Sequence, residues 1–240
     1  MKTPLYHQIA DQLRARIASG IYPLDSRLPT ENALAEQLEV SRPTVRQALD
    51  LLAREGLVMR VKGSGTFVSQ PKLVHESTSF ISAYREESQK KRRTLRTNVV
   101  CLREEEAESR VAEALRLRLG SSVIRLTRVR YLENVYGNAP VVYTTVYVPA
   151  GLYPGMTKVD FTDASLYEKL EELGRPVVHA SRRLEVVMPP AEAASGLRIT
   201  PFEPVIYIVS QGLTRDNLVV EYSESYYPAS RSSFRIEVNR

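Results

Sequence analysis

Apolar residues recur at every fourth position near the start of the chain. This spacing forms one stripe along a helix, and here the stripe consists of Leu5, Ile9, Leu13 and Ile17. Gly20 is a typical helix end. We therefore expect a first helix over residues 4–19 with a single buried face.

Two further helices follow at short intervals. Thr30 is placed to cap a short second helix, on which Leu34 and Leu38 share a face. Ser41 is placed to cap a third helix with Pro43 in its first turn, where no helical hydrogen bond is lost. The inward stripe of this helix consists of Val45, Leu49 and Leu52, and Gly56 ends it.

The outward face of the third helix is rich in hydrogen-bonding groups. Its first turns carry Arg42, Thr44, Arg46 and Gln47. Any one of these alone is an ordinary solvated side chain. Together, on the second of two closely joined helices, they predict a helix-turn-helix whose recognition helix contacts base edges and phosphates in the DNA major groove.

A hairpin is predicted directly after the third helix. Residues 57–61 and 66–68 alternate as strands around Lys62-Gly63-Ser64-Gly65. A narrow cationic tip of this kind can enter a minor groove or follow phosphates. Residues 1–70 therefore predict a winged helix-turn-helix DNA-binding domain.

The pattern changes beyond residue 97, where the chain repeats itself. "AEALRLRLGSSVIRLTRVR" followed by "PVVYTTVYVP" parallels "EAASGLRITPFEPVIYIVSQG" followed by "LVVEYSESYYP". Each unit predicts a short helix, a strand, a turn and a returning strand. Between them we expect a helix from about Ser165 to Gly174 and one more strand. Residues 97–240 thus predict an α+β domain with one antiparallel sheet, joined to the first domain by a linker over 71–96.

The two repeats differ in one place that suggests a binding site. Arg128 and Arg130 continue the face of Ile124 and Leu126, where the second repeat has Ser210 and Gly212. An unpaired buried charge is costly, so these arginines need anionic partners. The partner is either internal, Glu221 or Glu224, or a phosphate or carboxylate of a ligand, which the forked guanidinium groups suit.

The amino-acid composition limits the classes of partner and cofactor that we expect. The net charge of +5 is compatible with a polyanionic partner. One cysteine and three scattered histidines predict neither a disulfide nor a metal site, and we expect no cofactor. No apolar run is long enough to span a membrane, so we expect a cytoplasmic protein. The run Lys90–Arg93 is interpreted as a solvated loop, with nonspecific DNA contact as the alternative.

Residues 4–68 resemble the N-terminal domain of the GntR family of bacterial transcription regulators, through the segments "LPTE", "VSRPTVRQAL" and "GSGTFV". The resemblance implies that Arg42, Thr44 and Arg46 contact bases and phosphates, and that Lys62 and Gly63 form the wing tip. Many members have a DNA-contacting basic residue shortly after the first motif. Here that stretch is Asn32-Ala33.

The second domain resembles the UTRA effector-binding domain of the HutC subfamily, a fold related to chorismate lyase, over residues 77–236. The resemblance implies an anion clamp at Arg128 and Arg130 and a phosphate ligand at Ser165. It also implies sugar-hydroxyl contacts from Glu224 and Tyr226, and a site opening at Phe80. Phe80 is followed by Ile81 rather than the usual Ser or Thr, which leaves carboxylates open as ligands.

Together these observations predict a ligand-responsive repressor. We expect a homodimer on double-stranded DNA with a palindromic operator, released by a small anionic metabolite such as a sugar phosphate. One alternative is that the second domain only dimerises. The other is a lyase-like enzyme, for which the sequence contains no nucleophile-base pair.

Overall fold

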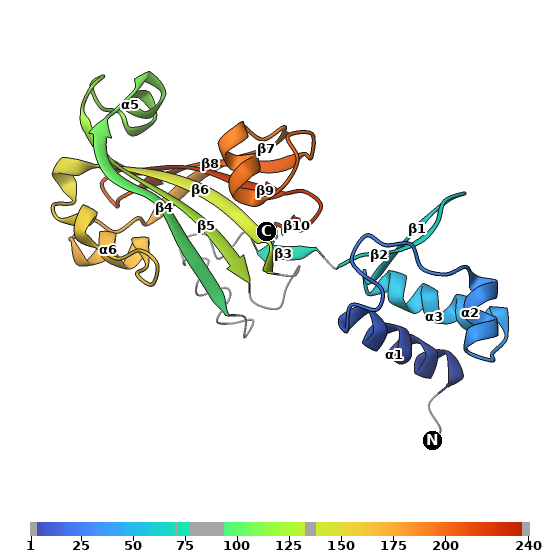
Figure 1. The fold of residues 1–240 in the computed structure, drawn as a ribbon. Coiled ribbons are helices and arrows are strands. Elements are labelled where there is room, and N and C mark those ends of the chain that lie inside the picture. The colour runs from blue at the N-terminus through green and yellow to red at the C-terminus, as the bar shows by residue number, and fades with distance from the viewer. Residues whose placement is uncertain (1–3, 71, 77–93, 133–137, 237–240) are drawn as a thin grey trace. The chain divides into compact units, whose positions relative to one another are not determined.

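The computed structural model describes residues 4–70, 72–76, 94–132 and 138–236. The chain divides into two compact units, residues 1–72 and 73–240, coloured blue to cyan and cyan to red in Figure 1. Most of the expected linker, including Phe80 and the run Lys90–Arg93, lies outside the described residues. No helix among the described residues is both long enough and apolar enough to cross a membrane.

The described residues of the first unit form three helices. They are α1 (Leu5–Ala18), α2 (Glu31–Gln37) and α3 (Arg42–Arg54). Ile9 and Leu13 of α1 are buried against the α3 stripe, as expected, but Leu5 is 51% exposed because it begins the helix. Val45, Leu49 and Leu52 are fully buried, which confirms the predicted inward face of α3.

The predicted caps place the start of α3. Thr30 Oγ1 accepts a hydrogen bond from the Ala33 N–H at 3.2 Å, and Ser41 Oγ accepts one from the Thr44 N–H at 3.3 Å. Each hydroxyl satisfies one of the free amides of a first turn. Pro43 lies in the first turn of α3. The local sequence thus determines where the recognition helix begins, and so which side chains project from its N-terminal end.

The wing is a two-stranded antiparallel hairpin of β1 (Val58–Val61) and β2 (Gly65–Val68). At its tip Gly63 has φ of 78° and Gly65 has φ of 121°, values that glycine adopts without a Cβ clash. Before α2, Arg27 forms a bridge with Phe67 of β2. The segment leading into α2 therefore lies against the wing.

The second unit is built on a six-stranded antiparallel sheet in the order β4-β5-β6-β9-β8-β7. The strands are β4 (Leu95–Glu106), β5 (Ser122–Leu132), β6 (Pro140–Pro149), β7 (His179–Val187), β8 (Val205–Leu213) and β9 (Val219–Pro228). A separate parallel pair joins β3 (Leu73–Glu76) to β10 (Ser232–Arg235). The helices are α5 (Ser109–Leu115), α6 (Leu166–Glu172), α7 (Ala191–Leu197) and the short 3-10 helices η3 (Ala150–Leu152) and η4 (Met156–Lys158).

The internal repeat is larger than the sequence pattern indicated. Each copy is strand, helix, strand, strand: β4-α5-β5-β6 and β7-α7-β8-β9. The residue after each helix is a left-handed arginine, Arg116 or Arg198, with φ of 54° in both. The copies meet where β6 pairs with β9, from Tyr143–Tyr226 to Tyr147–Tyr222.

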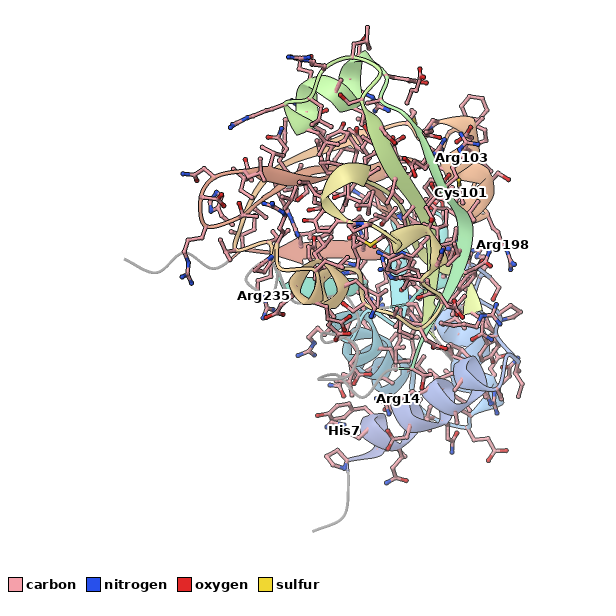
Figure 2. All side chains as sticks on the ribbon, turned by 90° about the vertical axis from the view of Figure 1, so that its left-hand side faces the viewer. His7, Arg14, Cys101, Arg103, Arg198 and Arg235 are labelled. Carbon is pink, nitrogen blue, oxygen red and sulfur yellow. The ribbon has the colours of Figure 1, made fainter. Side chains whose placement is uncertain are left out.

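The helices cover both faces of the sheet. α5 and α7 lie on one side and α6 on the other, as Figure 1 shows. The core beneath α6 includes Leu126, Val146 and Phe161. The chain's single cysteine, Cys101, is a partly buried free thiol that lies with Arg103 along the edge strand β4 (Figure 2).

Candidate nucleic-acid interface and ligand site

The outward face of α3 presents arginines that are gathered on one carboxylate. Glu31, the first residue of α2, accepts from Arg42 Nε at 3.0 Å and from Arg46 Nη2 at 2.9 Å. Arg60 of β1 lies 3.6 Å from the same carboxylate and 3.2 Å from Asp50. The side chains of Arg42 and Arg46 remain about half exposed. They are therefore held side by side yet stay open to a ligand.

The electrostatics of Glu31 support this arrangement. The hydrogen bond from Arg46 lowers the pKa of Glu31 by more than burial raises it. The hydrogen bond from Arg42 lowers the pKa further. The charged carboxylate accepts strong charge-assisted hydrogen bonds. DNA phosphates and guanine edges are acceptors of the same kind, so DNA can take over these arginines from Glu31.

The remaining predicted DNA contacts surround this cluster. Thr44 is partly buried and its hydroxyl pairs with Ser41 Oγ at 2.8 Å. Gln47 is exposed on α3, and Lys62 and Gly63 are exposed at the wing tip. A groove of about 310 Å³ runs between the start of α2, the recognition helix and the wing, and is lined by Arg27, Leu28, Pro29, Thr30, Glu31, Asn32, Arg42, Arg46, Gly65 and Thr66.

Two members of this face were not among the residues singled out from sequence. Arg60 of β1 pairs with Asp50 and Glu31. In the sequence it is one exposed residue of an alternating strand, and nothing there indicates these ion pairs. Glu31 was interpreted only as a favourable charge in the first turn of α2. Glu31 lies on α2, and Arg42 and Arg46 lie on α3, so only the tertiary fold shows the contact.

In the second unit, Arg128 is buried inside the domain. It lies on β5, on the sheet face covered by α6, and is 4% exposed. Among the residues that the structure describes, its Nε has no hydrogen-bond partner, and its guanidinium carbon lies 5.8 Å from the centre of the Phe161 ring. Burial lowers the pKa of Arg128 well below its ordinary value, and the positive charge of Arg130 adds to this. The nearby Tyr167 and Glu221 act in the opposite direction but do not offset the cost of burial.

A buried glutamate on β9 lies close enough to affect Arg128. Glu221 is 1% exposed, and its Oε2 accepts from the Tyr167 hydroxyl at 3.4 Å. Burial raises the pKa of Glu221, while Arg182 and Arg128 act in the opposite direction. Arg182 of β7 donates from Nε to Ser210 Oγ at 3.2 Å. The α6 side of the sheet thus combines buried cationic, anionic and hydroxyl groups.

Ser165 belongs to the same side. It caps α6, its Oγ accepting from the Glu168 N–H at 3.4 Å, and it is 5% exposed. Its hydroxyl proton remains able to donate to an anion. The predicted helix from Ser165 is confirmed by α6, and Gly174 follows its end with φ of 79°. Tyr167, two residues on, was missed because a tyrosine on a short helix is usually core.

The structure brings Arg128 and Arg130 together but places Glu224 and Tyr226 on the opposite face. Arg128 pairs with Thr144, which pairs with Ser225, and these share the α6 face. Side chains alternate along a strand, so Glu224 and Tyr226 point toward α5 and α7. The stretch "VEYSESYY" has polar residues at both odd and even positions, so its pattern alone could not assign the faces.

Glu224 has three partners on one carboxylate oxygen where it lies. It accepts hydrogen bonds from Tyr207 at 2.6 Å and Tyr222 at 2.9 Å, and forms an ion pair with Arg110 of α5. Tyr226 stacks on Tyr207 with ring centres 4.8 Å apart. These contacts join α5 to the sheet. Of the two glutamates considered from sequence as internal partners for the arginines, Glu221 is the one on their face.

A winged helix-turn-helix followed by an α+β domain with a buried cationic site defines a class of ligand-responsive DNA-binding regulators. Residues 5–68 match the bacterial regulatory proteins of the gntR family, and residues 90–233 match the UTRA domain. The chain belongs to the GntR family of transcription regulators and is a repressor of the HutC type with a UTRA effector domain.

Related sequences and a solved structure match this protein over nearly the whole chain. The HTH-type transcriptional repressor NagR of Bacillus subtilis (strain 168) is 30% identical over 232 residues, which cover 96% of this chain and 93% of NagR. The mannosyl-D-glycerate transport/metabolism system repressor MngR of Escherichia coli (strain K12) is 29% identical, covering 99% and 97%. The crystal structure of PhnF from Mycobacterium smegmatis superposes with a TM-score of 0.71 at 26% identity, covering 96% and 98%. The named relatives are repressors, not enzymes.

Proposed function

We propose that this repressor binds a palindromic operator as a homodimer and is released from it by a small anionic metabolite such as a sugar phosphate. The observation that carries the proposal is Arg128, a buried guanidinium whose Nε lacks a partner within the described ranges, two residues from Arg130 on the same face. An anion bound there would supply the missing counter-charge. As a DNA-binding repressor the protein would act in the cytoplasm.

The proposed effector site consists of Arg128 and Arg130 as the anion clamp, with Ser165 as a further hydrogen-bond donor. Glu221 and Tyr167 would bind the polar, uncharged part of the ligand, because a carboxylate and a phenol suit hydroxyl or amino groups. Sugar phosphates and hydroxylated carboxylates both combine these features. MngR is named for mannosyl-D-glycerate and another relative, from Pseudomonas aeruginosa, for histidine utilization, so the effector's identity is left to experiment.

The proposed DNA contacts are Arg42, Arg46, Gln47 and Thr44 in the major groove and Lys62 with Gly63 at the wing. Two recognition helices on adjacent half-sites require twofold symmetry, which is why a palindrome and a homodimer go together. For the effector to release DNA, it must bind more tightly to the arrangement of the dimer that does not fit the operator.

Fluorescence anisotropy tests the proposal. The full-length protein is titrated onto a duplex that it selects from a random library, with and without sugar phosphates and small carboxylates. One compound is expected to weaken DNA binding, and Arg128→Ala with Arg130→Ala is expected to abolish that effect with DNA affinity intact. Arg125→Ala is the matched control, since Arg125 lies on the same strand and on the opposite face. If no compound acts and the double variant only melts earlier, the second domain is a dimerisation scaffold.

A further inference from the structure

Arg27 is the one arginine lining the DNA-facing groove that was not assigned a role above. It precedes "LPTE", and its side chain is exposed. It lies against the wing at Gly65, where an added methyl group would approach Arg27 Nε to 2.7 Å and Nη2 to 3.2 Å. The missing Cβ of Gly65 therefore lets the guanidinium of Arg27 lie directly on the wing backbone.

Arg27 differs from the neighbouring arginines in having no paired carboxylate within the described residues. Arg42 and Arg46 share the Glu31 carboxylate, and Arg60 adds Asp50. Within the described part of the chain, the guanidinium of Arg27 has no hydrogen bond and no ion pair. Three of the four arginines in and beside this groove thus pair with two carboxylates. The positive charge of Arg27 is not paired with either of them. Such a charge contributes fully to the attraction of a polyanion.

The position of Arg27 indicates which part of DNA it contacts. Recognition-helix side chains face base edges, whereas residues beside the wing run along the sugar-phosphate backbone. Arg27 is joined to the wing by the Arg27–Phe67 bridge and lines the groove together with Arg42 and Arg46 of α3. Position 32, which lines the same groove, is the uncharged Asn32, so Arg27 is the cation available at this edge.

We propose that Arg27 binds a backbone phosphate of the operator at the junction between the recognition helix and the wing. The inference rests on the DNA-binding face proposed above and adds a contact outside the helix-turn-helix motif. A phosphate contact carries no base information, so Arg27 raises affinity for all duplexes and strengthens the dependence on salt.

The test measures DNA affinity against salt concentration for full-length wild type, Arg27→Gln, Arg27→Lys and Arg54→Gln. The probes are the duplex selected by the wild type and a scrambled duplex of equal length. Arg54 is the control because it is an exposed arginine at the far end of α3, outside the groove lining. Thermal melting of each variant checks folding, and Arg27→Gln is expected to melt like the wild type since its side chain makes no polar contact.

Arg27→Gln is expected to weaken both duplexes and to reduce the slope of log affinity against log salt by about 1. Arg27→Lys is expected to keep the slope, and Arg54→Gln to change neither quantity. An unchanged slope for Arg27→Gln, or a loss confined to the selected duplex, would overturn the phosphate contact. If the wild type itself selects and binds no duplex, the DNA-binding proposal fails and this one fails with it, so the two failures are distinguishable.

Discussion

Each unit contains a glutamate that influences arginines, Glu31 in the first and Glu221 in the second, and their pKa values move in opposite directions. Glu31 lies at the surface, and the hydrogen bond from Arg46 lowers its pKa. Glu221 is buried, and burial raises its pKa despite Arg182 and Arg128. The same pair of residue types is thus dominated by hydrogen bonding at one place and by burial at the other. The proposed DNA contacts involve the first pair, and the proposed effector site involves the second.

The largest expected effect in this comparison of the two glutamate–arginine clusters comes from replacing Arg128. Arg128→Met keeps the volume of the side chain and removes its buried charge. We expect the effector response of DNA binding to be lost, while the melting temperature stays equal or rises, because a buried charge without full pairing is replaced by apolar atoms. Anisotropy and thermal melting measure the two effects. Earlier melting together with a retained response would show that Arg128 is structural.

Arg46→Gln tests the surface cluster. We expect it to weaken binding to the selected duplex by about 1–3 kcal/mol, the range for a lost contact to a base pair. The effector response should persist at the higher protein concentrations then needed. Arg16→Gln, on α1 away from the groove, serves as the control. Equal losses on selected and scrambled duplexes would instead make Arg46 a phosphate contact.

Glu221→Gln tests the buried carboxylate through pH. A raised pKa means that the folded protein binds this proton more tightly than the unfolded chain does. Glu221 therefore reduces stability as the pH rises from its ordinary pKa of 4.5 through its folded value, and the reduction persists at neutral pH. We expect Glu221→Gln to flatten this fall in thermal melts, whereas Glu185→Gln on exposed β7 should not. If the melting temperature of Glu221→Gln fell with pH as steeply as that of the wild type, Glu221 would not be the source of the fall.

The smallest expected effect is that of Glu31→Gln. Because the pKa of Glu31 is lowered, its contribution is present above the ordinary value of 4.5 and disappears as the pH falls through the folded pKa. We expect a loss of about 0.5 kcal/mol at neutral pH, typical of exposed ion pairs, and none in acid. Urea denaturation at the two pH values measures it, with Glu36→Gln on the same helix as control. A loss that persists in acid would indicate a packing effect.

The fold was predictable wherever short-range patterns carry the information. Caps at Thr30 and Ser41, the buried stripe of α3 and the glycines of the wing each depend on residues near in sequence, and the structure confirms them. The repeat was predictable because its copies keep their spacing. Its first strands were assigned less completely: β4 was not predicted, and β7 was expected as one more strand but not as part of the repeat.

The sites were less predictable, because they depend on which strand faces meet. Arg128 stood out as a charge on an otherwise apolar face, and it is buried there. Glu224 and Tyr226 could not be assigned a face, since polar residues occupy both phases of β9. Glu31 needed the tertiary fold to bring α2 against α3.

The pairing of β6 with β9 joins the two repeats by five register pairs, fewer than any other ladder in the sheet. Arg128 and Arg130 belong to the first repeat, and Glu221 and Arg182 to the second. A molecule held by both sets therefore spans a seam between two half-sheets. Its binding would resist sliding or twisting of one half against the other, so a ligand at the proposed effector site would make the domain stiffer.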